Sequence, residues 1–173
     1  MHVWVLDLKG GMDYQFCRDM AHARLYADGD HSDGGLALGY LSVVREMRRR
    51  EALITAARKR NIHEYNAVAD VPLPYLAVIC DEVADLPTSY PAGMLDNEPE
   101  NILQCTVGGL EGTLRSLARL SGASGIILYV ATQRPTRDVL DGQIQANTPN
   151  RIIFGLANDK DSAVAYSTTK PTL

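Results

Sequence analysis

The sequence predicts an α/β protein whose mainly parallel sheet is flanked by helices. Two short apolar runs, Tyr75–Cys80 and Ile126–Ala131, are rich in β-branched residues, as buried parallel strands are. Both runs end abruptly in polar residues, and a segment with helical periodicity lies between them. Strands that alternate with helices favour a parallel sheet, because parallel neighbours need long crossover connections.

The first predicted strand is His2–Asp7, and residues 8–11 turn the chain at its carboxyl end. A loop-rich region follows as far as Gly35. From Gly35 to about Asn61, apolar residues recur at helical spacing. Basic residues lie between them, which predicts contact with DNA phosphates or with a neighbouring subunit, or else a solvated helix face. These basic residues are Arg45, Arg48, Arg49, Arg50, Arg58, Lys59 and Arg60.

In the second half of the chain, Pro72 and Pro74 interrupt the sequence before the Tyr75–Cys80 strand. Residues 87–107 contain three prolines and many polar residues, which predicts an inserted or mobile loop. A helix is expected from about Leu110 to Ser121, ended by glycines. Residues 151–157 predict a fourth strand, and residues 163–173 are expected to form a frayed tail.

The bulk composition fits one globular domain of 173 residues, with 46% hydrophobic and 22% charged residues. The formal net charge of −4 means that any contact with DNA needs a local basic surface or assembly. No apolar run reaches 18 residues, so we expect no membrane contact from this segment. Cys17, Cys80 and Cys105 match no metal or disulfide spacing and predict reduced thiols, hence a cytoplasmic location.

Two polar groups follow the predicted strands and suggest chemistry. Asp81 and Glu82 end the first apolar run, where an aspartate can hold Mg²⁺ and the adjacent carboxylate can polarise an attacking water. Gln133 follows the other run, and its amide can hydrogen-bond both a γ-phosphate and that water. Ligands of open α/β sheets bind at the carboxyl ends of the strands. The pattern therefore predicts a nucleotide triphosphatase core that binds a nucleoside triphosphate and Mg²⁺, although each group could also be an ordinary polar strand end.

Several longer segments resemble the FtsK/SpoIIIE family of the HerA–FtsK superfamily, whose members are hexameric ATP-driven DNA translocases. The similarity runs from about His2 to Ser162. The segments that carry it are Leu76–Leu86 (LAVICDEVADL), Leu117–Ile126 (LARLSGASGI), Ala131–Pro135 (ATQRP), Asp138–Gly142 (DVLDG), Ile144–Asn147 (IQAN) and Arg151–Ile152. The resemblance implies a RecA-like, P-loop NTPase type of fold and a partial motor domain over residues 1–173.

The resemblance also implies roles for individual residues. Asp81 and Glu82 correspond to the Walker B pair, with Asp81 at the metal and Glu82 as catalytic base. Gln133 corresponds to the γ-phosphate sensor. Asp7 and Lys9 are expected at the nucleotide-binding rim. The position of the arginine finger holds Gly122, and Arg119 is the nearest upstream candidate; Arg115, Arg134 and Arg151 are the others.

The sequence departs from the family pattern in one further respect: it contains no G-x-x-x-x-G-K-[ST] phosphate-binding loop. That loop supplies the backbone N–H groups and the lysine that bind phosphates, so the chain by itself is expected to bind ATP weakly and not to hydrolyse it. The fold is expected to lack the first, P-loop strand. The sheet would then have an internal gap or two exposed edges. Because exposed edges invite pairing with another chain, a rearranged strand order or a swapped oligomer is expected.

Three functions remain open at this point. The first is part of an ATP-driven motor for double-stranded DNA that assembles as a homo-oligomeric, hexameric ring. The second keeps the fold but moves protein, as in type VII secretion ATPases. The third is a non-catalytic remnant with an interaction role. The pathway (chromosome partition, sporulation, conjugation or secretion) and any membrane anchor of a parent protein lie beyond what these residues indicate.

Overall fold

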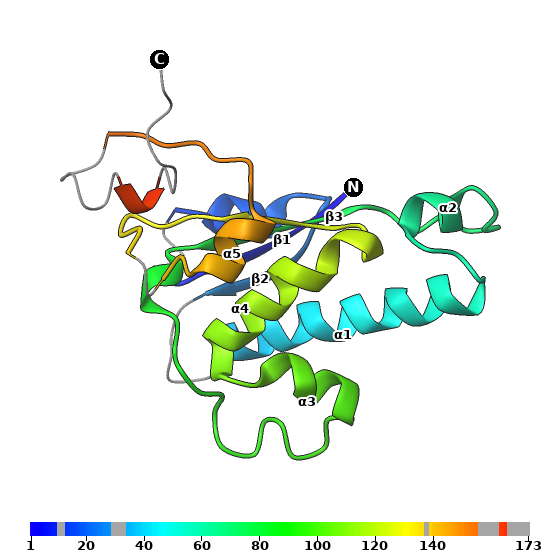
Figure 1. The fold of residues 1–173 in the computed structure, drawn as a ribbon, viewed down its shortest axis with the longest axis horizontal. Coiled ribbons are helices and arrows are strands. Elements are labelled where there is room, and N and C mark those ends of the chain that lie inside the picture. The colour runs from blue at the N-terminus through cyan, green and yellow to red at the C-terminus, as the bar shows by residue number, and fades with distance from the viewer. Residues whose placement is uncertain (10–12, 29–33, 137–138, 156–162, 166–173) are drawn as a thin grey trace.

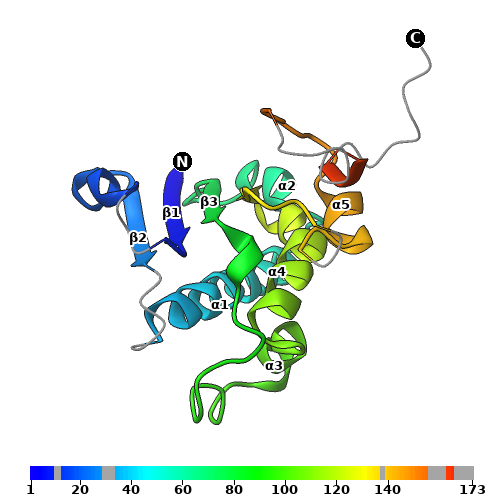
Figure 2. The ribbon, with the colours of Figure 1, turned by 90° about the vertical axis from the view of Figure 1, so that its left-hand side faces the viewer.

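A four-stranded, fully parallel sheet with strand order β2-β1-β3-β4 forms the centre of the molecule (Figures 1 and 2). The computed structural model describes residues 1–9, 13–28, 34–136, 139–155 and 163–165. The strands are β1 (His2–Asp7), β2 (Ala23–Asp28), β3 (Leu76–Asp81) and β4 (Ile126–Val130). The predicted parallel α/β sheet is therefore confirmed.

The helices are α1 (Gly35–Ala56), α2 (Ile62–Asn66), α3 (Glu100–Thr106), α4 (Gly109–Leu120) and α5 (Gly142–Asn147). Short 3-10 turns, η1 (Gln15–Asp19), η2 (Val83–Asp85) and η3 (Ser121–Ser124), connect them. Figure 2 shows α1, α3 and α4 together on one side of the sheet. None of the helices in the described part of the chain is long and apolar enough to cross a membrane.

The core lies between the sheet and these three helices. Alternate strand residues such as Leu6, Val78 and Ile126 face it, as the period of two in a strand requires. Helix α1 approaches the sheet closely at Gly39, where a Cβ would lie 2.7 Å from a methyl carbon of Leu6. Glycine at this position therefore lets α1 pack directly on β1 and β2.

The helical predictions are mostly confirmed, with different ends. The helix expected at 110–121 is α4, and Gly125 follows it with a left-handed φ of 75°. The helix expected from Gly35 to Asn61 ends earlier, at Ala56, because Arg58 takes a φ of 55°. Residues 87–107, predicted as a loop, contain α3, whose Ile102 and Cys105 are buried in the core.

Two strand predictions are wrong. The region between β1 and Gly35, predicted as loop, contains β2, which pairs in parallel with β1. The predicted fourth strand at 151–157 is absent over its described residues 151–155, which have no strand partner; Ala157 lies outside the described residues. Ile152 and Phe154 are 86% and 82% exposed there, so apolar content did not produce a sheet strand. Of the predicted tail, residues 163–165 form a helical turn, and the rest lies outside the described residues.

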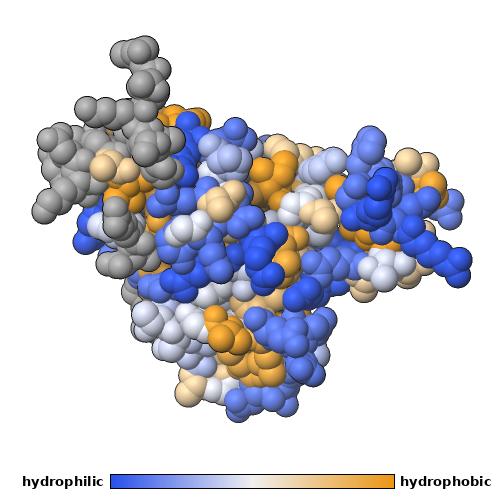
Figure 3. Space-filling model, in the orientation of Figure 1, coloured by the Kyte–Doolittle hydropathy of each residue, from blue (hydrophilic) through white to orange (hydrophobic). Residues whose placement is uncertain are grey.

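One face of the terminal strand β4 is partly exposed to solvent. Leu128 and Val130 pack against the core, whereas Ile127 and Tyr129 are 42% and 54% exposed. Figure 3 shows further apolar surface over the α3 region, where Leu103 and Val107 are exposed. β4 is a terminal strand of the described sheet and pairs directly with β3, so the sheet has no internal gap between these two strands.

Candidate functional site at the carboxyl ends of β1, β3 and β4

The carboxyl ends of three strands bring the predicted site residues to one edge of the sheet. Asp7 at the end of β1 is in register with Asp81 at the end of β3. The backbone N–H of Val83 donates to the carbonyl of Ala131 (3.1 Å), which joins the residues after β3 to those after β4. We call this group the strand-end rim: Asp7, Lys9, Asp81, Glu82, Thr132 and Gln133.

Glu82 is the most constrained residue of the strand-end rim. It has left-handed backbone angles (φ 50°, ψ 54°), which are uncommon for a residue with a side chain. Its side chain accepts hydrogen bonds from the Thr132 hydroxyl (3.0 Å) and the Gln133 backbone N–H (3.3 Å). Lys9 Nζ lies 3.7 Å from the same carboxylate. Glu82 is only 5% exposed, so these contacts fix the direction of its carboxylate.

Asp81 and Asp7 form a carboxylate pair beside Glu82. Burial raises the pKa of Asp81. The charge of Lys9 and a hydrogen bond from the Glu82 backbone N–H oppose this rise, and the negative charges of Asp7 and Glu82 add to it. Asp7 is fully buried, and its Oδ1 accepts the backbone N–H of Lys9 (2.8 Å). Asp7 Oδ2 has no hydrogen-bond partner among the described residues. Negative charge is therefore concentrated at this edge of the sheet.

Gln133 has the exposed side chain expected of a group that contacts a ligand. Its backbone touches Glu82, so the two residues lie on the same edge, as the sequence pattern predicts. Thr132 is a further residue of this site that the sequence analysis does not predict. Its position directly after an apolar strand and next to Gln133 is the feature of the sequence that could have indicated it.

Arg119 does not lie at the strand-end rim. It is an exposed residue in the last turn of α4, which leads into the start of β4, so it lies toward the amino ends of the strands. The other arginine candidates have structural partners. Arg134 pairs with Asp85 (3.1 Å), Arg115 pairs with Asp141, and Arg151 donates to the Ala165 carbonyl.

The basic residues of α1 pair mainly with carboxylates of this chain. Arg45 pairs with Glu98, Arg48 with Glu51, and both Arg49 and Arg50 with Glu46. Beyond α1, Arg60 pairs with Glu64 (Nε to Oε1, 2.8 Å). These pairings count against the interpretation as a surface for DNA phosphates, because carboxylates of the same chain neutralise most of these arginines.

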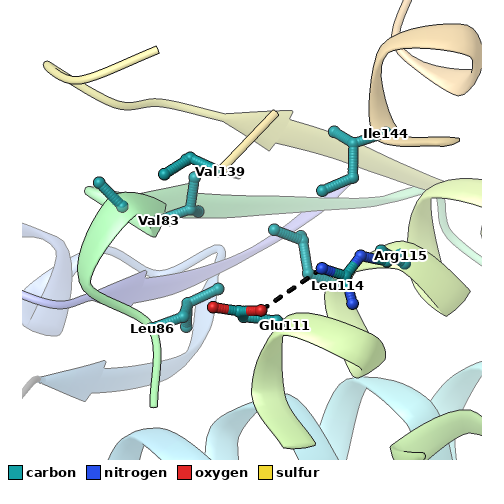
Figure 4. Close-up of a pocket in the computed structure, with 8 residues that line it drawn as sticks. Val83, Leu86, Glu111, Leu114, Arg115, Val139 and Ile144 are labelled. Atoms are coloured by element: carbon teal, nitrogen blue, oxygen red, sulfur yellow. Dashed lines mark hydrogen bonds and ion pairs between the residues drawn. The ribbon is translucent and has the colours of Figure 1, made fainter. Parts of the chain in front are cut away.

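A small cavity lies behind the strand-end rim, between η2, α4 and α5 (Figure 4). Its apolar lining includes Val83, Leu114 and Ile144, and the Glu111–Arg115 ion pair borders it. Its volume of about 90 Å³ is well below the roughly 300 Å³ at which ligand pockets begin. This cavity is therefore too small to hold a nucleotide.

The donor set at the strand-end rim suits Mg²⁺ better than a transition metal. The described residues contain no group of three or more His, Cys, Asp or Glu side chains that could hold a metal. Mg²⁺ keeps several water ligands and is commonly bound by only one or two carboxylates. Asp81, with the unpartnered oxygen of Asp7 beside it, meets that requirement.

Comparisons of the sequence agree with these features. No family model matches the chain. The DNA translocase FtsK of Halalkalibacterium halodurans is 37% identical over 136 residues, which is 73% of this chain and 15% of the relative. That of Chlorobaculum tepidum is 42% identical over 122 residues, 70% of this chain and 13% of the relative. The DNA translocase SpoIIIE of Bacillus subtilis is 35% identical over 130 residues, 69% and 14%.

Solved structures give the same fold. The pCW3 conjugation coupling protein TcpA, in a monomer form with ATPγS, matches with a TM-score of 0.71 and 30% identity over 97% of this chain and 44% of that one. EssC (ATPases 2 and 3) of Geobacillus thermodenitrificans matches with a TM-score of 0.70 over 100% of this chain and 29% of that one. Its identity of 17% supports the fold alone.

The parallel sheet, its flanking helices and the polar residues at the strand ends define a RecA-like fold of the P-loop ATPase type. Within that class, the chain belongs to the FtsK/SpoIIIE family. It spans only 13–15% of the length of the three curated relatives described above.

Proposed function

We propose that this chain carries the water-activating part of an FtsK/SpoIIIE-type ATPase motor that moves double-stranded DNA. The observation that carries the proposal is the meeting of Glu82 and Gln133, which are 51 positions apart in sequence and in contact at one sheet edge. A base and a phosphate-sensing amide must both reach the water that attacks the γ-phosphate. Their shared location supports that chemistry.

Each residue of the strand-end rim has a distinct task in this proposal. Asp81 holds Mg²⁺, directly or through water, and Glu82 accepts the proton of the attacking water. Thr132 and the backbone of Gln133 keep the Glu82 carboxylate aimed, and the Gln133 side chain orients the water against the γ-phosphate. Asp7 and Lys9 complete the nucleotide-binding rim. Bound Mg²⁺ would offset the charge that develops on the transferred phosphoryl group.

Arg119 is the proposed arginine finger, acting in a neighbouring subunit of a homo-oligomeric, hexameric ring. Its place away from its own strand-end rim fits a group that serves another subunit's site. Arg119 is exposed, and among the described residues its guanidinium has no hydrogen-bond or ion-pair partner. The phosphate-binding loop is absent from this sequence, so nucleotide binding depends on a segment that supplies it.

The test is a chimeric motor in which this chain replaces the matched stretch of the Chlorobaculum tepidum translocase. We expect DNA-stimulated ATP hydrolysis, and a loss of at least about 100-fold in kcat with Glu82→Gln. Glu111→Gln is the matched control, since that carboxyl pairs with Arg115 away from the rim. A chimera that folds and binds nucleotide, but hydrolyses it equally fast with Glu82→Gln, would contradict the proposal.

Transport of protein is the second candidate, because EssC shares the fold. Identity of 35–42% to the DNA translocases described above, against 17% to EssC, favours DNA. If the chimera hydrolysed ATP at the same rate with and without DNA, protein transport would become the favoured function. The interaction-only alternative predicts assembly with intact subunits and no dependence of hydrolysis on Glu82.

A further inference from the structure

We propose that Asp7 is a second carboxylate ligand of the divalent cation held by Asp81, so that the chain binds Mg²⁺ or Mn²⁺ without nucleotide. The inference rests on the proposed function, since both place the cation at Asp81. It adds a ligand from a different strand and a binding event that needs no phosphate.

The register of β1 and β3 brings the two aspartates together. Asp7 and Asp81 are directly paired on adjacent parallel strands, so their side chains project on the same face of the sheet. Neighbouring strands lie about 4.8 Å apart, a distance that two carboxylates can span to meet one cation.

One carboxylate oxygen of Asp7 lacks a hydrogen-bond partner in the described part of the chain. The side chain is fully buried, and Oδ1 is used by the Lys9 backbone N–H, whereas Oδ2 has no partner in the described part of the chain. A buried carboxylate oxygen without a partner is costly, and such groups are normally paired or bound to metal. Oδ2 is therefore available for a ligand.

The strand-end rim carries a net negative charge. Asp7, Asp81 and Glu82 carry three formal negative charges at the strand-end rim, and Lys9 supplies one positive charge. The difference is −3 + 1 = −2, which a divalent cation balances. Two carboxylates plus water are the ligands that Mg²⁺ prefers, whereas Ca²⁺ takes six to eight oxygen ligands.

The test is titration of the full chain with Mn²⁺ in the absence of nucleotide, followed by the electron paramagnetic resonance signal of free Mn²⁺. We expect one saturable site in the wild type. Asp7→Asn and Asp81→Asn should each weaken binding by at least about tenfold. Asp85→Asn is the matched control, because Asp85 is exposed, pairs with Arg134 and should change the affinity less than about twofold.

Absence of a saturable site in the wild type would overturn the inference, and so would Asp7→Asn binding as tightly as the wild type. The wild-type titration is free of any effect of mutation on folding.

The outcome can be separated from that of the proposed function. Mn²⁺ bound through Asp7 in a chain whose chimera does not hydrolyse ATP would leave this inference standing and remove the motor proposal. An active chimera in which Asp7→Asn leaves metal affinity unchanged would do the reverse.

Discussion

Arg50 is the buried cation of α1, and its removal should destabilise the chain more than any other arginine substitution on this helix. Its side chain is 2% exposed, and it donates to Glu46 (2.7 Å) and to the carbonyls of Pro74 (2.8 Å) and Ser124 (3.2 Å). These acceptors belong to α1, to the segment before β3 and to η3. Arg50 therefore ties the helix to both segments that lead into the neighbouring strands β3 and β4.

The size of the effect follows from burial. Arg50→Ala leaves two carbonyls without this donor and opens space in a packed region. Removing one member of a buried ion pair typically costs about 3–5 kcal/mol. For a chain of this length, that corresponds to a fall in Tm of roughly 6–20 °C.

Urea denaturation followed by the fluorescence of Trp4, the chain's single tryptophan, measures this change. Arg49→Ala is the matched control, because Arg49 pairs with the same Glu46 but its side chain is 52% exposed. Exposed pairs contribute about 0–1 kcal/mol, so the control should lose little. Equal losses in the two variants would refute the argument that burial, and not the ion pair itself, sets the cost.

The loss of unfolding free energy caused by Arg50→Ala should also depend on pH. Burial acts to raise the pKa of Glu46, but hydrogen bonds from Arg49 and Arg50 outweigh it and hold the pKa below its usual value of 4.5. A carboxyl with a lowered folded-state pKa stabilises the protein above the unfolded pKa, and this contribution is lost as pH falls through the folded value. The difference between wild type and Arg50→Ala should therefore narrow below pH 4.5.

Four other outcomes are expected. Isothermal titration of the chain alone should find no micromolar affinity for Mg-ATP; such affinity would contradict the need for a separate phosphate-binding loop. Asp81→Asn should stabilise the fold at pH 7 but not at pH 3. Burial raises the folded-state pKa of Asp81 above its usual value of 3.8. The wild type therefore loses stability as pH rises from the unfolded-state pKa through the folded-state pKa, and asparagine avoids this loss. The Cys80 thiol, whose pKa burial raises to about 12, should react with a disulfide reagent only after unfolding; rapid reaction of the folded chain would refute its burial. Light scattering should detect self-association through β4, and a monodisperse monomer would count against it.

The parts of the fold that the sequence predicts well are those with a strong local signal. The β3 and β4 runs are apolar, short and bounded by polar residues, and α4 has regular apolar spacing before a glycine. Their strand ends fix the site, because the carboxyl ends of parallel strands share an edge. The meeting of Glu82 with Gln133 was therefore predictable, although the Thr132 hydrogen bond was not.

The errors arise where tertiary contacts decide. Residues 23–28 begin and end with weak strand formers, so only pairing with β1 makes them a strand. Residues 151–155 contain a short apolar run, Ile152–Phe154, as strands often do, but they have no partner strand among the described residues. The three prolines of residues 87–107 favour a loop prediction, although the last of them, Pro99, directly precedes the first residue of α3. The partners of the α1 arginines lie partly on distant segments, such as Glu98, and no local pattern reveals them.

The left-handed backbone of Glu82 means that the best sequence for stability and the best sequence for chemistry differ at this position. A residue with a side chain in that conformation costs about 1–2 kcal/mol, and glycine would avoid the cost. Selection for folding alone would therefore drift toward glycine here. Keeping glutamate requires selection for what its carboxylate does, so laboratory evolution for thermostability, with no demand for turnover, should discard this side chain early.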